Sequence, residues 1–300
     1  MVGSLSFSRR RLGKWAGACA VAGFGLARAQ DGRIVLGQSA AFSGPAQQLG
    51  AQFHAGAKLF FDQLNAKGGV NGRPVEIRTV DDGYEPDRCQ ANTEKLIRDD
   101  VFALFGYVGT PTSLVALPMA SSARMPFLAP FTGAMSLRTP FRREAFHVRA
   151  SYDDETALIV RQLTNLGQSR IGVFHQNDSY GQAGLAGVTK ALAAQQLKPV
   201  AVATVERNSV NVTDAVAKLA KSDAQAIVLV SAYASCAAFI RAARKAGFGG
   251  TFYNVSFVGT QALADALGAD GRGVMVSQVM PSPYNPARPI AREFAAAAGQ

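Results

Sequence analysis

The sequence predicts an α/β protein with two parallel sheets, each built from alternating strands and helices. One unit, an apolar strand followed by an amphipathic helix, recurs along the chain, and its strands are continuous apolar runs such as residues 226–230. Parallel strands buried on both faces have this composition. The pattern restarts near Ala150 with a new helix and a new strand. We therefore expect two similar sheets, each covered by helices on both faces.

The first segment of the chain has the features of an export signal. Arginines at 9–11 precede an uncharged apolar stretch at 15–26, and Ala27-Arg28-Ala29 fits a cleavage site. This predicts a signal peptide over residues 1–29. Residues 8–14 resemble a twin-arginine (Tat) signal, and the Sec route stays open. The apolar stretch is too short to span a bilayer, which needs about twenty residues, so the product is expected to be exported and soluble.

Composition limits the classes of partner. Without the signal the formal net charge falls from +10 to +5, because five basic and no acidic residues are removed. The densest remaining basic cluster, residues 138–143, is short, so no nucleic-acid binding is expected.

The chain that remains after removal of the signal exceeds the usual size of one core, which predicts two domains. Cys89 and Cys236 fall in predicted helices of different halves, so we expect two buried free thiols and no disulfide.

The apolar runs predict ten strands, most of them separated by helices. The first helix has an apolar face that ends at Gly68-Gly69. The boundary between the two domains is expected at 149–152, giving domains at 30–149 and 150–277. A helix begins within the proline-rich tail at 278–300 and is cut off at its end, which suggests a truncated sequence. The predicted strands are 34–39, 75–81, 103–107, 126–129, 146–149, 171–175, 199–205, 226–231, 251–254 and 273–278, and the apolar face of the first helix consists of Phe53, Ala57, Phe60, Phe61 and Leu64.

Ligands of parallel sheets bind beyond the carboxyl ends of the strands, so the strand-to-helix turns are where a site is expected. The first turn, residues 37–45, is not G-x-G-x-x-G, and the sequence contains no G-x-x-x-x-G-K-[ST], G-x-S-x-G or H-E-x-x-H. His54, His147 and His175 are far apart in the sequence. Neither a cofactor, a metal site nor an enzymatic activity is therefore expected.

The turn at 106–113 is the strongest candidate for a ligand contact. Thr110 suits an N-cap and Pro111 suits the first helical position, which would leave free N–H groups at the carboxyl edge of the sheet. Such a helix end attracts an anion. A ligand carboxylate could thus be held without an arginine; the alternative is that Thr110 only caps its own helix. After the next strand, Phe131, Thr132 and Gly133 can add backbone donors to the same anion.

The second half of the chain places aromatic residues at equivalent turns. Tyr180, Tyr233 and the pair Ser256-Phe257 each follow a predicted strand. Tyrosines at the edge of a cleft can cover an apolar ligand and hydrogen-bond it. Each could instead be ordinary packing, but their repetition after successive strands favours a site.

Several segments together give the chain a likeness to a known family over about residues 34–289. They are Ser43-Gly44-Pro45, 65–73, Asp81-Asp82 with Pro86, 106–113 and 178–181. In these segments the sequence resembles the leucine/isoleucine/valine-binding protein family, the type I periplasmic receptors of ABC importers. The resemblance implies the type I periplasmic-binding-protein fold, with two Rossmann-like lobes joined by a hinge of three crossovers, and a return of 278–300 to the first lobe.

The resemblance also implies roles for individual residues. Thr110 and the backbone of 131–133 would hold the ligand carboxylate, and Leu49 and Tyr107 would border the pocket for the ligand side chain. The groups that would close from the second lobe are Tyr180, Tyr233 and Ser256.

Two departures from the family pattern stand out. The family's disulfide in the first lobe would join the positions of Tyr84 and Gly109, so it is absent here. The acidic residue that faces the ligand ammonium in the family aligns with Ser256. A buried ammonium without a carboxylate partner is costly. The ligand is therefore expected to be an amine-free aromatic or 2-oxo acid, or else a branched-chain amino acid whose ammonium is met by Asp178 or another nearby acid.

The resemblance implies a monomeric receptor in the periplasm that delivers a small carboxylate or amino-acid ligand to an ABC permease of the inner membrane. Closure of the two lobes on the ligand would be the signal that the permease reads. The alternatives are a ligand sensor that passes closure to a signalling partner, and an exported hydrolase. For a hydrolase the sequence offers no nucleophile, base and acid set.

Overall fold

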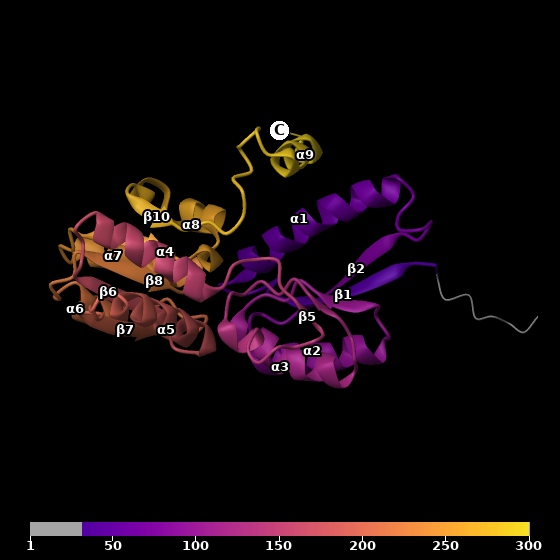
Figure 1. The fold of residues 1–300 in the computed structure, drawn as a ribbon, viewed down its shortest axis with the longest axis horizontal. Helices are drawn as coiled ribbons and strands as arrows, with labels where there is room; N and C mark the ends of the chain where they lie inside the picture. The colour runs from indigo at the N-terminus through magenta and orange to yellow at the C-terminus, as the bar shows by residue number, and fades with distance from the viewer. Residues whose placement is uncertain (1–31, 300) are drawn as a thin grey trace, which may run out of the picture. The chain divides into compact units, whose positions relative to one another are not determined.

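Two five-stranded parallel sheets with the same strand order form the framework of the protein (Figure 1). The computed structural model describes residues 32–299, so the predicted signal peptide lies outside the described residues. The sheets have the orders β2-β1-β3-β4-β5 and β10-β9-β8-β6-β7. If the five strands of each sheet are numbered 1 to 5 along the chain, both sheets have the order 2-1-3-4-5 when read from the edge at β2 or β7. This is the doubly wound arrangement of α/β proteins. The predicted fold class is confirmed.

We term the first sheet with α1–α3 the first lobe, and the second sheet with α4–α8 the second lobe. The strands of the first lobe are β1 (Ile34–Ala40), β2 (Val75–Asp81), β3 (Ala103–Phe105), β4 (Phe127–Leu128) and β5 (Ala145–Phe146), and its helices are α1 (Gln47–Ala66), α2 (Pro86–Arg98) and α3 (Thr110–Ser122). The strands of the second lobe are β6 (Ile171–Gln176), β7 (Ala201–Val205), β8 (Ala226–Val230), β9 (Thr251–Asn254) and β10 (Val274–Val276). Its helices are α4 (Tyr152–Asn165), α5 (Ser179–Ala193), α6 (Thr213–Leu219), α7 (Tyr233–Lys245) and α8 (Thr260–Leu267), and α9 (Pro289–Ala298) follows.

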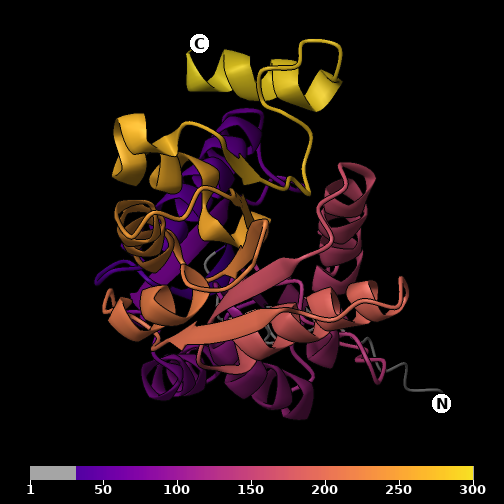
Figure 2. The ribbon, with the colours of Figure 1, turned by 90° about the vertical axis from the view of Figure 1, so that its left-hand side faces the viewer.

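The second sheet is covered on both faces, as predicted. All five residues of β8 are buried and point alternately to the two faces. Val228 joins a buried cluster with residues of α4 and α5, whereas Leu229 joins a second cluster with residues of α6, α7 and α8. Figure 2, a view turned by 90°, shows the strands of this sheet in orange and salmon between their helices.

The first sheet is covered unequally. Helices α2 and α3 pack on one face over Leu104 and Phe127. On the other face α1 is the covering helix, and Phe61 of α1 contacts the ring of Phe105 at 5.8 Å. Phe105 pairs with Leu128 and Leu128 with Phe146, so the three side chains form a row on the α1 face. The row becomes more exposed along its length, and Phe146 is 53% exposed.

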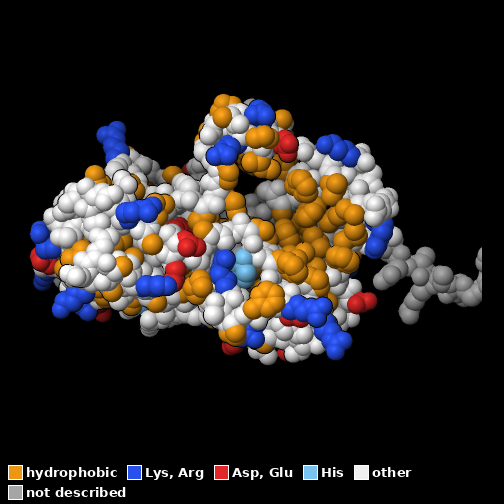
Figure 3. Space-filling model, in the orientation of Figure 1, with side chains coloured by type: hydrophobic (Ala, Val, Ile, Leu, Met, Phe, Trp, Pro, Cys, Tyr) orange, Lys and Arg blue, Asp and Glu red, His pale blue; other side chains and the backbone are white. Residues whose placement is uncertain are grey.

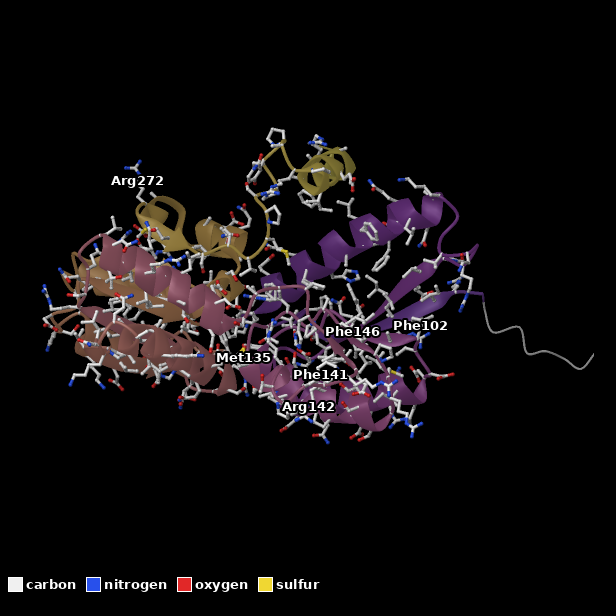
Figure 4. All side chains as sticks on the ribbon, in the orientation of Figure 1. Phe102, Met135, Phe141, Arg142, Phe146 and Arg272 are labelled. Carbon is white, nitrogen blue, oxygen red and sulfur yellow. The ribbon has the colours of Figure 1, made fainter. Side chains whose placement is uncertain are left out.

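Apolar side chains therefore remain at the surface of the first lobe. Figure 3 shows them in orange over α1 and the strands beside it, and Figure 4 labels Phe102 and Phe146 there. Phe60, expected on the buried face of α1, is 57% exposed and contacts the ring of Phe61. It lies at the edge of the apolar face of a helix that covers this part of the sheet alone. The expectation that helices cover both faces of this sheet is thus wrong for the part near β5.

The predicted strands are all present, most within two residues of their expected ends. The largest difference is β5, expected at 146–149 and found at Ala145–Phe146. Residues 147–149 leave the sheet and lead into α4, whose first turn is closed by a capping box between Ser151 and Asp154. Arg149 consequently lies in the connection between the lobes and not in a strand. The domain boundary at 149–152 stays a prediction.

The thiols of Cys89 and Cys236 are buried and free, as predicted. Burial raises the pKa of both thiols far above the usual range. Cys89 belongs to α2 in the first lobe, and Cys236 belongs to α7 in the second. The third cysteine of the sequence, Cys19, lies outside the described residues.

The tail of the chain returns toward the first lobe. Helix α9, in yellow in Figures 1 and 2, lies beside α1 and contacts it. Among residues 32–299 we find no helix that is both long and apolar enough to cross a membrane.

Candidate ligand-binding site

The site lies where turns from the carboxyl ends of both sheets meet. In a 2-1-3-4-5 sheet the strand order reverses between the first and third strands, here β1 and β3 in one lobe and β6 and β8 in the other, and ligands bind at that point. A single buried apolar cluster contains residues from both sets of turns. It includes Leu49 and Tyr84 of the first lobe, and Tyr152, Tyr180 and Phe257 of the second.

Two buried threonines form part of the candidate site on the first lobe. The Oγ1 atoms of Thr110 and Thr132 are 2.6 Å apart and share a hydrogen bond, and both residues are fully buried. Thr132 Oγ1 also accepts a hydrogen bond from the N–H of Ala134. The structure therefore brings together the two turns that the sequence assigned to one anion.

The start of α3 differs from the prediction in one respect. Gly109, not Thr110, is the residue before the helix, and Thr110 is the first helical residue. The Ser113 N–H already donates to the Gly109 carbonyl, and Pro111 has no N–H. The first turn can therefore offer at most the N–H groups of Thr110 and Thr112 to an anion. The buried Ser113 hydroxyl beside them has no partner.

Aromatic rings from the two lobes contact one another across the site. The ring of Phe257 stacks on Phe131 at 5.3 Å, lies 4.5 Å from Tyr180 and 6.1 Å from Tyr84. Tyr152 lies 5.4 Å from Tyr180. The hydroxyls of Tyr152 and Tyr180 are buried without a hydrogen-bond partner. Burial raises the pKa of the Tyr152 hydroxyl, and the positive charge of Arg149 opposes that rise.

A buried ion pair that the sequence pattern did not predict borders these rings. Arg149 Nη2 donates to Glu155 Oε2 at 2.9 Å and to Ser256 Oγ at 2.7 Å, with both charged side chains almost fully buried. Glu155 Oε1 accepts from the Ser256 N–H and the Ser277 hydroxyl. The guanidinium lies over the rings of Phe131 and Tyr152, at 5.4 and 5.3 Å. Ser256 is thus bound to an arginine and a glutamate at once.

Not every predicted residue faces the site. The ring of Tyr107 packs on Phe127 in the core under α2 and α3, and its hydroxyl bonds Thr93 at 3.1 Å. Its assignment to the ligand pocket is therefore wrong. The positive φ of 62° at Gly106 interrupts the strand alternation and turns Tyr107 to the same face as Leu104.

The other predicted residues lie in or beside the site. Leu49 is buried in the shared cluster, Tyr233 is half-buried at the start of α7 and packs against it, and the Gly133 carbonyl accepts from the N–H of Tyr152. Within residues 32–299 no group of three or more His, Cys, Asp or Glu side chains is placed to hold a metal ion.

Asp178, the alternative partner for a ligand ammonium, is already engaged. Its Oδ1 accepts from the N–H groups of Tyr180 and Gly181, so it caps α5. Its Oδ2 accepts from Gln176 and lies 3.5 Å from Arg207. Arg207 in turn bonds Glu85 of the first lobe at 2.7 Å, which ties the two lobes at this edge of the site.

The positions of the family disulfide are neighbours in space. A Cβ atom added at Gly109 would lie 2.2 Å from the ring of Tyr84. The aromatic ring thus fills the place that the resemblance gives to a disulfide, and it reaches the second lobe, where Gln176 Nε2 donates to its hydroxyl at 3.3 Å.

Two adjacent carboxylates at the end of β2 have pKa values that are shifted in opposite directions. Asp81 accepts from the Ser43 hydroxyl and from backbone N–H groups of Phe42 and Gly83; although partial burial opposes it, these bonds hold its pKa well below the usual range. Asp82 is fully buried, and burial raises its pKa to about 6 despite hydrogen bonds from Ser39 and the Tyr84 N–H.

Asp82→Asn is expected to stabilise the protein at neutral pH and to have little stabilising effect in acid. Because the folded-state pKa of about 6 exceeds the ordinary 3.8, the proton-linked stability from Asp82 is full below about pH 4 and is lost as the pH rises through 6. This loss amounts to about 2 to 3 kcal/mol. Urea unfolding between pH 4 and pH 8 should show the difference between variant and wild type growing by that amount. Asp81→Asn is the control, and its effect should run oppositely, destabilising at neutral pH; parallel curves for the two variants would contradict the assignment.

Two facing lobes with doubly wound parallel sheets, and ligand-type groups at the turns between them, define the class of type I periplasmic binding proteins. The chain belongs to the periplasmic binding protein family, whose family model matches residues 33–300. Among solved structures it resembles a possible leucine/isoleucine/valine-binding protein from Rhodopirellula baltica SH 1. That structure is 36% identical, has a TM-score of 0.85, and the match covers 89% of this chain and 74% of that chain.

Two further proteins illustrate the range of the likeness. An amino acid binding protein of Pseudomonas aeruginosa is 24% identical over 238 residues, which are 78% of this chain and 63% of that relative. The chain thus spans less than two thirds of this relative's length. An ABC transporter solute binding protein of R. palustris, solved in complex with benzoate, is 19% identical with a TM-score of 0.79, over 88% of this chain and 73% of that one, and shows the same fold.

Proposed function

We propose that the protein is the periplasmic substrate-binding receptor of an ABC importer and that it holds a small carboxylate ligand between its two lobes. The observation that carries the proposal is that the buried Thr110–Thr132 pair of the first lobe adjoins Phe131, on whose ring Phe257 of the second lobe stacks. Hydroxyl groups and a helix N-terminus suit a carboxylate, and the rings suit an apolar body. The family membership and the names of its relatives support a binding protein and not an enzyme.

The proposed mechanism is closure of the lobes on the ligand. The ligand first meets Thr110, Thr132 and the backbone of 131–133, and closure then brings Tyr180 and Tyr233 against it. The contacts of Arg207 with Glu85 and of Gln176 with Tyr84 support a closed arrangement. We propose that the protein works as a monomer whose closed form is read by the permease, and that residues 1–29 direct its export to the periplasm by the Tat or Sec route.

Thermal unfolding against a panel of ligands tests the proposal. A ligand at 100 times its dissociation constant stabilises the folded state by about 2.7 kcal/mol. The panel consists of leucine, isoleucine and valine, their 2-oxo acid analogues, and aromatic acids such as benzoate. A rise in Tm with any carboxylate supports the receptor function, whereas no shift across the panel, or turnover of a bound compound, counts against it.

Thr110→Val is expected to weaken carboxylate binding by about tenfold, because a hydrogen bond to a charged group contributes about 1.5–3 kcal/mol. The valine keeps the shape of the side chain and removes the hydroxyl that faces Thr132. Isothermal titration calorimetry measures the loss. Thr112→Val is the matched control, because the Thr112 hydroxyl bonds only the carbonyls of Val108 and Gly109 in its own turn. Equal affinities for wild type and Thr110→Val would remove Thr110 from the site.

A further inference from the structure

Arg149 has buried donors that its protein partners do not use. Guanidinium carries N–H groups on three nitrogens and can only donate. Nη2 alone serves both Glu155 and Ser256, while Nε and Nη1 are buried without a partner. A buried charged donor without an acceptor is costly, so an acceptor is expected beside it. No protein group in the described part of the chain supplies it.

The surroundings of these donors add further donors and no free charge of opposite sign. The Tyr152 ring lies against the guanidinium, and the hydroxyls of Tyr152 and Tyr180 are buried and unpaired. Both oxygens of Glu155 are already occupied, by Arg149 on one side and by Ser256 and Ser277 on the other. A carboxylate, which accepts several hydrogen bonds at once, would satisfy these donors.

The same arrangement disfavours an ammonium. Glu155 is committed to Arg149, and Asp178 is committed to the start of α5, to Gln176 and to Arg207. The unpaired buried acceptor nearest in sequence to Ser256 is Asn254 Oδ1, which is uncharged and could receive a hydroxyl but not neutralise a cation. An amino acid would thus bring a charge for which these side chains offer no countercharge.

We infer that Arg149, held by Glu155 and Ser256 between the rings of Phe131 and Tyr152, binds the ligand carboxylate, and that the ligand is an organic acid without an ammonium group. This inference rests on the proposed function and adds to it the cationic contact and the ligand class. Glu155 is then a positioning residue: it holds Nη2 and fixes the guanidinium, so that the N–H groups of Nε and Nη1 remain for the ligand. The Thr110–Thr132 pair and Arg149, whose guanidinium lies over the ring of Phe131 next to Thr132, would contact the same ligand.

The test compares matched ligands on wild type and variants by isothermal titration calorimetry. The ligand pairs are benzoate with benzamide, and 4-methyl-2-oxopentanoate with leucine, so that each pair differs at one charged group. Arg149→Gln removes the anchor, but it leaves Glu155 as a buried charge without its partner. The double variant Arg149→Gln/Glu155→Gln removes both charges together and leaves no buried charge without its partner. The control is Arg241→Gln/Asp270→Asn, an exposed ion pair of the second lobe.

We expect wild type and the control to bind at least one acid of the panel and to bind its amide or amino-acid counterpart at least tenfold more weakly. The double variant should lose at least tenfold in affinity for that acid while remaining folded by circular dichroism. Arg149→Lys, which keeps the charge but lacks the forked donors, should recover only part of the loss.

Other results would overturn the inference and leave the receptor function intact. They are unchanged acid affinity in the double variant, equal binding of benzoate and benzamide, or binding of leucine in preference to its oxo acid. If wild type binds none of the carboxylates, the proposed function itself fails, and the inference fails with it.

Discussion

Replacing Gly50 with alanine is expected to destabilise the protein by about 3 kcal/mol or more. Gly50 lies in the first turns of α1, where the helix touches the chain leaving β1, and an added Cβ would lie 2.0 Å from the Ala41 carbonyl oxygen. The obstacle is backbone and not the end of a flexible side chain, so a change of rotamer cannot relieve it. Insertion of atoms into tight packing costs about 1–3 kcal/mol and occasionally more.

Gly56→Ala in the same helix is the matched control for Gly50→Ala. Gly56 is exposed, and an added Cβ meets nothing within 4 Å. This variant should stabilise the protein by about 0.5–1 kcal/mol, because alanine favours helix interiors over glycine. Urea unfolding measures both effects. Because Leu49 of the candidate site precedes Gly50, displacement of the helix in Gly50→Ala should also weaken ligand binding. Equal stabilities for the two variants would contradict the close approach of α1 to the chain after β1.

Phe257→Ala is expected to cost about 4 kcal/mol of stability and to weaken ligand binding. Phe257 is fully buried and contacts rings of both lobes, with Phe131 and Tyr84 on the first side and Tyr180 on its own. Truncating such a ring costs about 3–5 kcal/mol. Its removal also takes away an apolar contact that holds the closed arrangement. Denaturant unfolding and calorimetric titration measure the two effects.

Phe239→Ala separates these effects. Phe239 is equally buried, but it stacks on Phe174 at 4.2 Å inside the second lobe, away from the first. We expect a similar loss of stability with affinity close to that of wild type. If both variants lose the same affinity, the loss reflects general destabilisation, and Phe257 has no specific role between the lobes.

The fold was predictable because its signals are local. The run at β8 reads as a strand buried on both faces, and the structure shows each of its residues buried. The predicted end of β5 was wrong, because its two residues carry little pattern and the chain then leaves the sheet toward the capping box of α4. The exposure of Phe60 depends on which elements cover the sheet beside α1, and the helical periodicity alone does not predict them.

The site was predictable only in part. Thr110 and Thr132 were recognisable because parallel strands bring successive turns to one edge. Tyr107 was misassigned because a single glycine torsion decides which face its ring takes. Arg149 was overlooked because its role depends on Ser256, 107 positions away in the sequence. An arginine six residues before Glu155, at the predicted boundary, was the available signal, and its meaning comes only from tertiary contacts.

The burial of one described cysteine in each lobe gives a separate probe of how each lobe opens. A buried thiol with a raised pKa reacts with iodoacetamide only when its surroundings open. Alkylation of Cys89 and Cys236, followed by mass spectrometry of their peptides, therefore reports the opening of α2 and α7 individually. We expect Cys89 to react first, since the first lobe leaves Phe146 exposed on one face of its sheet. Equal rates would mean that the two lobes unfold as one cooperative unit.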